Sequence, residues 1–191
     1  MAIYLNDHLM DFDLEDALTK LSEQRREQAL RFKHEIGQRT CAAAYLLLCE
    51  ALAKEYGIMW KPVFEYGEHG KPSIAGRPDI HFNLSHCREA ALCGVSNQPI
   101  GVDVESVKQA KDSLVNYTMN EDEAALIHQS DNPGLVFTQL WTMKESVMKL
   151  TGQGINNQLK DVLKRNDVTW KTVVSDDCRY VYSICQFTEC P

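Results

Sequence analysis

Hydrophobic and polar positions follow two different periods along the chain. Leucine and alanine recur at helical spacing among charged residues over 13–32, and a second helix is expected from about Glu35 to Tyr56. The middle of the second helix, 42–48, is apolar almost all round, which predicts deep burial. Gly57 follows as its C-terminal stop.

After residue 57 the pattern becomes strand-like, then helical again, and finally strand-like. Alternating or apolar runs bounded by turn residues predict strands at 63–66, 81–85, 90–96 and 100–104. Asn120 and Glu123 have the spacing of a capping box, and Asn132-Pro133 is typical of a helix start. That last helix should reach about Leu150, and strand-like runs return within 168–187. Helices and antiparallel strands thus occur twice, which predicts an α+β protein of two similar halves, 1–98 and 99–191.

Composition is that of an ordinary globular chain. It has 191 residues, 44% apolar and 25% charged, which excludes a mainly disordered or collagen-like protein. No run approaches the roughly 18 apolar residues of a membrane span, and the first residues lack the pattern of a signal peptide. The seven cysteines are odd in number and include no Cys-x-x-Cys pair, so we expect reduced thiols in a cytoplasmic protein.

The net charge of −7 disfavours a nucleic-acid binder. Any anionic ligand must therefore be held by a local basic cluster.

Two carboxylates stand on one face of the strand expected at 100–104. Because side chains alternate, Asp103 and Glu105 point away from the apolar face, with Cα atoms about 6.6 Å apart. Their oxygens could meet on one Mg²⁺. The alternative is a solvated strand face.

The helix expected at 134–150 carries further chemistry. Glu145 could complete a three-carboxylate site with Asp103 and Glu105, and Lys144 and Lys149 could then meet phosphate oxygens. The alternative is an ordinary Glu–Lys pair on a helix surface.

Two shorter motifs are weak alone. Ser85-His86 stands where a strand runs into a loop, and a histidine there can donate to phosphate. Gly70-Lys71-Pro72 is a turn with a flanking cation.

In combination these motifs are specific. Over roughly 25–155 the chain resembles the long, single-chain 4′-phosphopantetheinyl transferases, on four segments that occur in one order: Gly70-Lys71-Pro72, Phe82-Asn83-Leu84-Ser85-His86, Ile100–Glu105, and Trp141–Ser146 with Lys149 and Gly152. The resemblance implies two α+β halves related by a pseudo-twofold axis, with coenzyme A between them. It also implies Mg²⁺-dependent transfer of the phosphopantetheine arm to a serine of a fatty-acid, polyketide or peptide carrier protein, which releases adenosine 3′,5′-bisphosphate.

The resemblance also implies roles for single residues. Asp103, Glu105 and Glu145 match the magnesium ligands. The residues that match coenzyme contacts are Lys144 and Lys149 for the phosphates, Ser85 and His86 for the pyrophosphate, Lys71 and Pro72 beside the adenine and ribose, and Arg39 and Thr40 near the 3′-phosphate. Arg25 is a looser match to an upstream basic residue, because the spacing from Phe32 to Arg39 is about one residue short.

For the reaction that the resemblance implies, we expect Glu145, Lys149 and His86 to be the catalytic residues. Either Glu145 or a magnesium-bound water removes the serine proton, while the cations stabilise developing charge. We expect a monomer that docks its acidic carrier through a local basic rim and an apolar patch. The patch is Leu114, Val115, Tyr117 and Met119, unless these residues belong to the core.

Two other functions use the same carboxylates. One is a different Mg²⁺ enzyme that acts on a phosphodiester or nucleotide, and the other is a carrier-protein binder without catalysis. The first leaves Gly70-Lys71-Pro72 and Ser85-His86 unexplained, and the intact ligand set disfavours the second.

Overall fold

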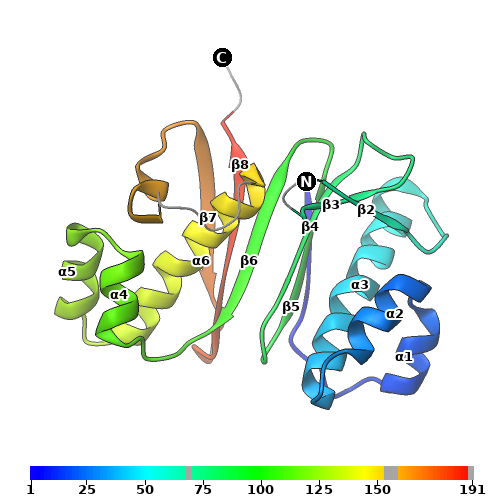
Figure 1. Cartoon of the computed structure of the whole chain (residues 1–191), viewed down its shortest axis with the longest axis horizontal. Coiled ribbons are helices and arrows are strands. Elements are labelled where there is room, and N and C mark those ends of the chain that lie inside the picture. The colour runs from blue at the N-terminus through cyan, green and yellow to red at the C-terminus, as the bar shows by residue number, and fades with distance from the viewer. Residues whose placement is uncertain (68–69, 153–158, 189–191) are drawn as a thin grey trace.

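A computed structural model describes residues 1–67, 70–152 and 159–188 (Figure 1). In chain order the elements are β1 (Ala2–Asn6), α1 (Leu14–Lys20), α2 (Glu23–Leu30), α3 (Glu35–Tyr56), β2 (Phe64–Tyr66), β3 (Pro72–Ile74), β4 (His81–His86), β5 (Ala91–Ser96), β6 (Ile100–Ser106), α4 (Asp112–Thr118), α5 (Glu121–Gln129), α6 (Pro133–Thr151), the 3-10 helix η1 (Leu159–Lys164), β7 (Val168–Val174) and β8 (Tyr180–Phe187). The predicted α+β class is confirmed.

Two antiparallel three-stranded sheets meet in the middle of the molecule. Their strand orders are β1-β5-β4 and β6-β8-β7, so each half places its first strand beside its last and its middle strand at the far edge. In both halves the helices lie between the first and second of these strands, and they include one long helix, α3 or α6. Figure 1 shows α1–α3 and α4–α6 on opposite outer sides of the two sheets. The β2–β3 hairpin belongs to the N-terminal half.

The helical pattern over 13–32 forms two helices rather than one. Leu21 is extended, with φ −72° and ψ 157°, and the Ser22 side chain accepts from the Arg25 backbone N–H to cap a new helix. A polar cap inside an otherwise helical pattern therefore divides the segment. The expected turn at 70–72 is also shorter than predicted, since Pro72 already begins β3.

The other helix ends follow the sequence closely. The capping box of Asn120 and Glu123 is present, and α3 ends at Gly57, whose φ of +66° suits glycine. Asn132 caps α6, and Gly152 closes it.

One apolar cluster joins the two halves. Leu92 of β5 packs with Ile100 and Val102 of β6, and with Tyr180 and Ile184 of β8. Burial of this shared surface fixes the two sheets against each other.

Gly101 sets the distance between β6 and α6. A Cβ atom at this position would lie 2.0 Å from the carbonyl oxygen of Ser146 and 2.5 Å from the nitrogen of Leu150. The strand therefore lies directly on the helix backbone, and the next residue on the same face, Asp103, also faces α6. In the described part of the chain, no helix is long and apolar enough to span a membrane.

Candidate active site

β6 and α6 bring a carboxylate and an amine together. The Nζ atom of Lys149 donates to Oδ1 of Asp103 at 2.6 Å. Asp103 is buried, with 3% of its surface exposed, so this contact is little screened by water. Figure 1 shows the two elements, the yellow helix α6 and the green strand β6, side by side.

β4 adds a hydroxyl from the other half. Ser85 Oγ donates to Asp103 Oδ1 at 2.8 Å, and it accepts from Lys149 Nζ at 2.9 Å. The Val104 backbone N–H also donates to this oxygen, at 3.2 Å. The structure thus joins three of the sequence-predicted site residues, from three distant segments, in one partly buried network.

Glu145 lies in the electrostatic field of this network. Burial and the neighbouring Asp103 raise its pKa to about 7, Lys149 lowers it, and Glu105 adds to the rise. The carboxyl group can therefore gain or lose a proton near neutral pH. Glu105 is more exposed and forms a 3.4 Å ion pair with Lys108.

One carboxylate oxygen of the network is available to bind a ligand. Oδ2 of Asp103 is buried and has no hydrogen-bond partner among the described residues. Such an oxygen beside Glu145 and Glu105 suits a hard cation such as Mg²⁺. No three acidic, histidine or cysteine side chains within 1–67, 70–152 and 159–188 are already arranged as a ligand set. Two of the three carboxylates have amine partners, since Lys149 contacts Asp103 and Lys108 contacts Glu105.

His86 ends β4 beside the network. Burial, Arg25 and Lys149 together lower the pKa of His86 to about 4, with burial the largest cause. The imidazole is therefore neutral at physiological pH and offers one N–H donor. Its ring packs edge-on against Phe32, with 6.0 Å between the centroids.

Known proteins are similar in sequence to this chain over most of its length. A family model described as the 4′-phosphopantetheinyl transferase superfamily matches residues 99–184. A 4′-phosphopantetheinyl transferase of Bacillus subtilis is 30% identical over 157 residues, which are 81% of this chain and 70% of that relative. The chain belongs to the 4′-phosphopantetheinyl transferase family.

Two other members of this family are similar to the chain to about the same degree. The 4′-phosphopantetheinyl transferase Sfp of Bacillus subtilis (strain 168) is 29% identical over the same shares of both chains. The 4′-phosphopantetheinyl transferase HetI of Nostoc sp. is 31% identical over 151 residues, which are 74% of this chain and 64% of that relative.

Lys144, expected at the phosphates from the family resemblance, lies elsewhere. Its side chain is fully buried, with Nζ 2.8 Å from Oε2 of Glu123 and 2.7 Å from the carbonyl oxygen of Leu159. It therefore links α6 to α5 and η1, and the structure does not bring it to the network around Asp103.

Lys71 connects the β2–β3 hairpin to α6. Its Nζ donates to the carbonyl oxygen of Leu150 at 2.8 Å, at the C-terminal end of that helix, where positive charge is favoured. Burial lowers the pKa of Lys71. Pro72 follows as the first residue of β3. The segment expected beside the adenine thus bridges the two halves.

Arg39 and Thr40 lie near the start of α3. Arg39 Nε contacts Glu35 at 2.8 Å, and its Nη1 donates to the carbonyl oxygen of Phe12 at 2.7 Å. Thr40 is buried and donates to the carbonyl oxygen of Gly37 at 3.1 Å. These contacts stay within the N-terminal half and do not reach Asp103.

Arg25 is buried within the N-terminal half, against α3. Nη2 donates to the Cys41 carbonyl oxygen at 3.2 Å, the guanidinium lies over the rings of Tyr45 and Phe64, and Nε has no partner among the described residues. The positive charge of Arg25 adds to the lowering of the pKa of His86, which burial chiefly causes.

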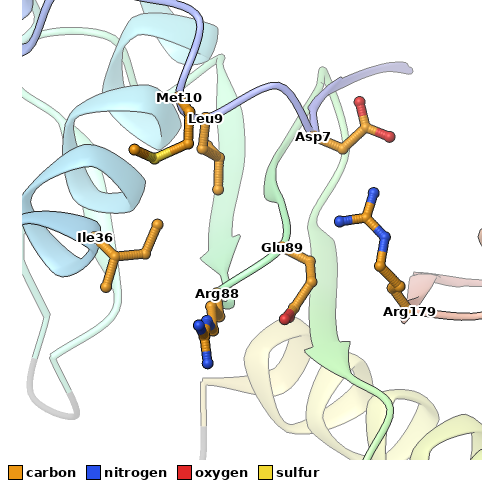
Figure 2. Close-up of a pocket in the computed structure, with 7 residues that line it drawn as sticks. All are labelled: Asp7, Leu9, Met10, Ile36, Arg88, Glu89 and Arg179. Atoms are coloured by element: carbon orange, nitrogen blue, oxygen red, sulfur yellow. The ribbon is translucent and has the colours of Figure 1, made fainter.

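A separate pocket opens where β1, α3 and the β4–β5 turn approach the β7–β8 turn (Figure 2). Its volume is about 370 Å³, and its lining residues are Asp7, Leu9, Met10, Ile36, Arg88, Glu89 and Arg179. None of the sequence-predicted site residues lines it.

Asn83 is a buried polar residue to which the sequence assigned no role. Its Oδ1 accepts from the Val102 backbone N–H at 2.8 Å. Two sequence signals point to it: it belongs to the segment 82–86 that carries the family resemblance, and it stands two residues before Ser85, on the same strand face.

Proposed function

We propose that this protein transfers the 4′-phosphopantetheine arm of coenzyme A to a serine of an apo acyl or peptidyl carrier protein. The observation that carries the proposal is the partly buried contact of Lys149 with Asp103 and Ser85, in a chain of this family. In this contact a cation and a carboxylate of the C-terminal half meet a hydroxyl of the N-terminal half. The second product is adenosine 3′,5′-bisphosphate.

Asp103, Glu105 and Glu145 are proposed to hold Mg²⁺. The unpartnered Oδ2 of Asp103 leaves one buried ligand oxygen available, and burial raises the pKa of Glu145, a rise to which the acidic neighbours Asp103 and Glu105 add. When bound, the ion offsets charge on the pyrophosphate and on the leaving phosphate.

Lys149, Ser85 and His86 are proposed to hold the pyrophosphate. Lys149 brings positive charge to the point where negative charge develops, and Ser85 and neutral His86 each offer one hydrogen. A phosphate that takes the Lys149 ammonium also frees Asp103 Oδ1 for a cation.

Glu145 is proposed to accept the serine proton. Without a bound cation, burial raises the pKa of this carboxyl to about 7, and a bound Mg²⁺ would lower that pKa, so that Glu145 is deprotonated and able to accept a proton at neutral pH. The protonated Glu145 then releases that proton to solvent and becomes a carboxylate again.

The remaining coenzyme contacts are proposed for Arg39, Thr40, Lys71 and Pro72. In this view coenzyme A lies between two pseudo-twofold-related halves, 1–98 and 99–191. The repeated strand order and helix order support that division, and the short turn between β5 and β6 contains the boundary.

A carrier-docking patch is proposed on α4. Leu114 and Tyr117 are 40% and 66% exposed, whereas Val115 and Met119 are buried and belong to the core. Lys108 and Lys111 precede the helix, and an acidic carrier needs such local positive charge on a protein of net charge −7. The protein is expected to work as a monomer.

The test is the mass of an apo carrier protein after incubation with the enzyme, coenzyme A and Mg²⁺. Wild-type protein should add the phosphopantetheine mass, and Asp103→Ala and Glu145→Ala should not. Asp131→Ala, which changes an exposed acid elsewhere, should act as wild type. No mass gain with any carrier, but cleavage of a phosphodiester or nucleotide, would favour the other Mg²⁺ enzyme. Carrier binding without either reaction would favour a non-catalytic binder.

A further inference from the structure

One edge of β6 is closed by side chains instead of a neighbouring strand. Its other edge pairs with β8. On the β4 side, the Val102 N–H donates to Asn83 Oδ1 at 2.8 Å, and the Val104 N–H donates to Ser85 Oγ at 3.2 Å. Both acceptors are buried, so water does not replace them.

A third contact continues this series beyond β4. Ser106 Oγ donates to the carboxylate of Glu89, which stands in the β4–β5 turn at the edge of the pocket in Figure 2. We use the term side-chain ladder for the three residues Asn83, Ser85 and Glu89. Their contacts fall on every second residue of β6.

The ladder alternates with the carboxylates. Asp103 lies between its contacts at Val102 and Val104, and Glu105 lies between those at Val104 and Ser106. Because neighbouring side chains on a strand point to opposite faces, holding the backbone on both sides of Asp103 fixes the direction of its carboxylate.

The face of β6 that carries Asp103 also leaves the strand little freedom to move. Gly101 already lies against the backbone of α6 at Ser146 and Leu150, so β6 cannot move closer to the helix. Asn83 and Gly101 therefore hold adjacent points of β6 from two directions.

We propose that Asn83 is a positioning residue for the reaction: it fixes β6 at Val102 and so places Asp103 for metal ligation. Glu89 contacts the side-chain hydroxyl of Ser106 and so limits movement of the end of β6 that carries Glu105. The inference rests on the proposed function, in which these carboxylates serve Mg²⁺. Groups that orient metal ligands in this way typically change metal affinity or activity by about 10–100-fold when they are removed.

The first experiment compares Asn83→Ala with Tyr45→Phe. The control removes one buried side-chain bond to backbone, from Tyr45 Oη to the Pro62 carbonyl oxygen, without touching β6. Calorimetric titration with coenzyme A is run in Mg²⁺ and in EDTA. Asn83→Ala should lose about tenfold or more affinity in Mg²⁺ and little in EDTA, and Tyr45→Phe should match wild type in both. Affinity of Asn83→Ala within twofold of wild type in Mg²⁺, or an equal loss in EDTA, would overturn the proposal.

A second variant guards against a folding defect. Asn83→Ser keeps a side-chain oxygen, as Ser85 does for Val104, and should recover part of the Mg²⁺-dependent affinity. Hydrogen exchange at the Val102 amide should be faster in Asn83→Ala than in wild type. Unchanged exchange there would show that Asn83 does not hold the strand.

Glu89 gives an independent comparison. Glu89→Ala should weaken the Mg²⁺-dependent affinity, and Glu89→Gln, which keeps an acceptor for Ser106, should retain it. Equal behaviour of the two variants would exclude this part of the ladder. Wild-type protein that neither binds coenzyme A nor modifies a carrier would refute the proposed function instead, while the exchange of the Val102 amide would still report on Asn83.

Discussion

Lys149 Nζ lies 2.6 Å from Oδ1 of Asp103, although the two residues are 46 positions apart in the chain. Because Gly101 lets β6 lie directly on α6, this contact joins the strand that carries Asp103 to the helix that carries Glu145. Lys149 partly neutralises the acidic group, and a bound phosphate would compete for the same ammonium.

Replacement of Lys149 by alanine should reduce turnover more than coenzyme binding. The contact is expected to strengthen as charge develops in the transition state, and loss of one such group commonly lowers kcat about 100-fold or more. Steady-state kinetics with an apo carrier would measure kcat and the coenzyme KM separately. Lys164→Ala, which changes an exposed lysine paired with Asp161, is the control. Unchanged kcat in Lys149→Ala would contradict the assigned role.

His86 should make stability depend on pH. The folded protein holds the pKa of His86 at about 4, below the roughly 6.5 of an unfolded chain, so the unfolded state binds more protons between these values. The free energy of unfolding should therefore rise from pH 4 to 6.5, by at most about 1.4 kcal/mol per pH unit from this group, and level off above. Chemical denaturation across that range should show a shallower slope for His86→Gln. Parallel curves for the two proteins would refute the burial of a neutral imidazole.

Gly101→Ala should destabilise the protein. The added methyl would overlap the α6 backbone, and overpacking of this kind typically costs about 1–3 kcal/mol, or more where backbone must move. Gly67→Ala is the matched control, because its Cβ would meet nothing nearer than the Lys71 carbonyl oxygen at 3.8 Å. Thermal unfolding of the two variants would check the difference, and equal midpoints would contradict close packing of β6 on α6.

Lys144→Met should lower stability by about 3–5 kcal/mol, because it leaves the Glu123 carboxylate buried without its cation. The coenzyme KM should change little, since Lys144 does not reach the network around Asp103. The double variant Lys144→Met/Glu123→Gln removes the buried charge, keeps an acceptor for the Asn120 backbone N–H, and should recover part of the stability. A large rise in KM without loss of stability would restore the phosphate role that the family resemblance implied.

Sequence patterns predicted the parts of this site that depend on local geometry. Strand alternation placed Asp103 and Glu105 on one face, and the capping and helix signals at Asn132 and Gly152 defined the helix that carries Glu145. These features follow from the two periods of regular backbone.

Contacts between distant segments could not be predicted in this way. Helical spacing shows that Lys144 and Lys149 lie on different rows of α6, but the direction of each row depends on its partners. Glu123, which the sequence identified only as part of a capping box, draws Lys144 inward. The role of Asn83 likewise depends on the edge of β6, which no local pattern places beside β4.

A crystal of the protein with coenzyme A and Mn²⁺, with anomalous scattering used to locate the ion, tests the central claim most directly. The account predicts one strong peak within coordination distance of the carboxylates of Asp103 and Glu145 and of the coenzyme pyrophosphate. An ion bound to the pyrophosphate while neither of these carboxylates ligates it would contradict the account.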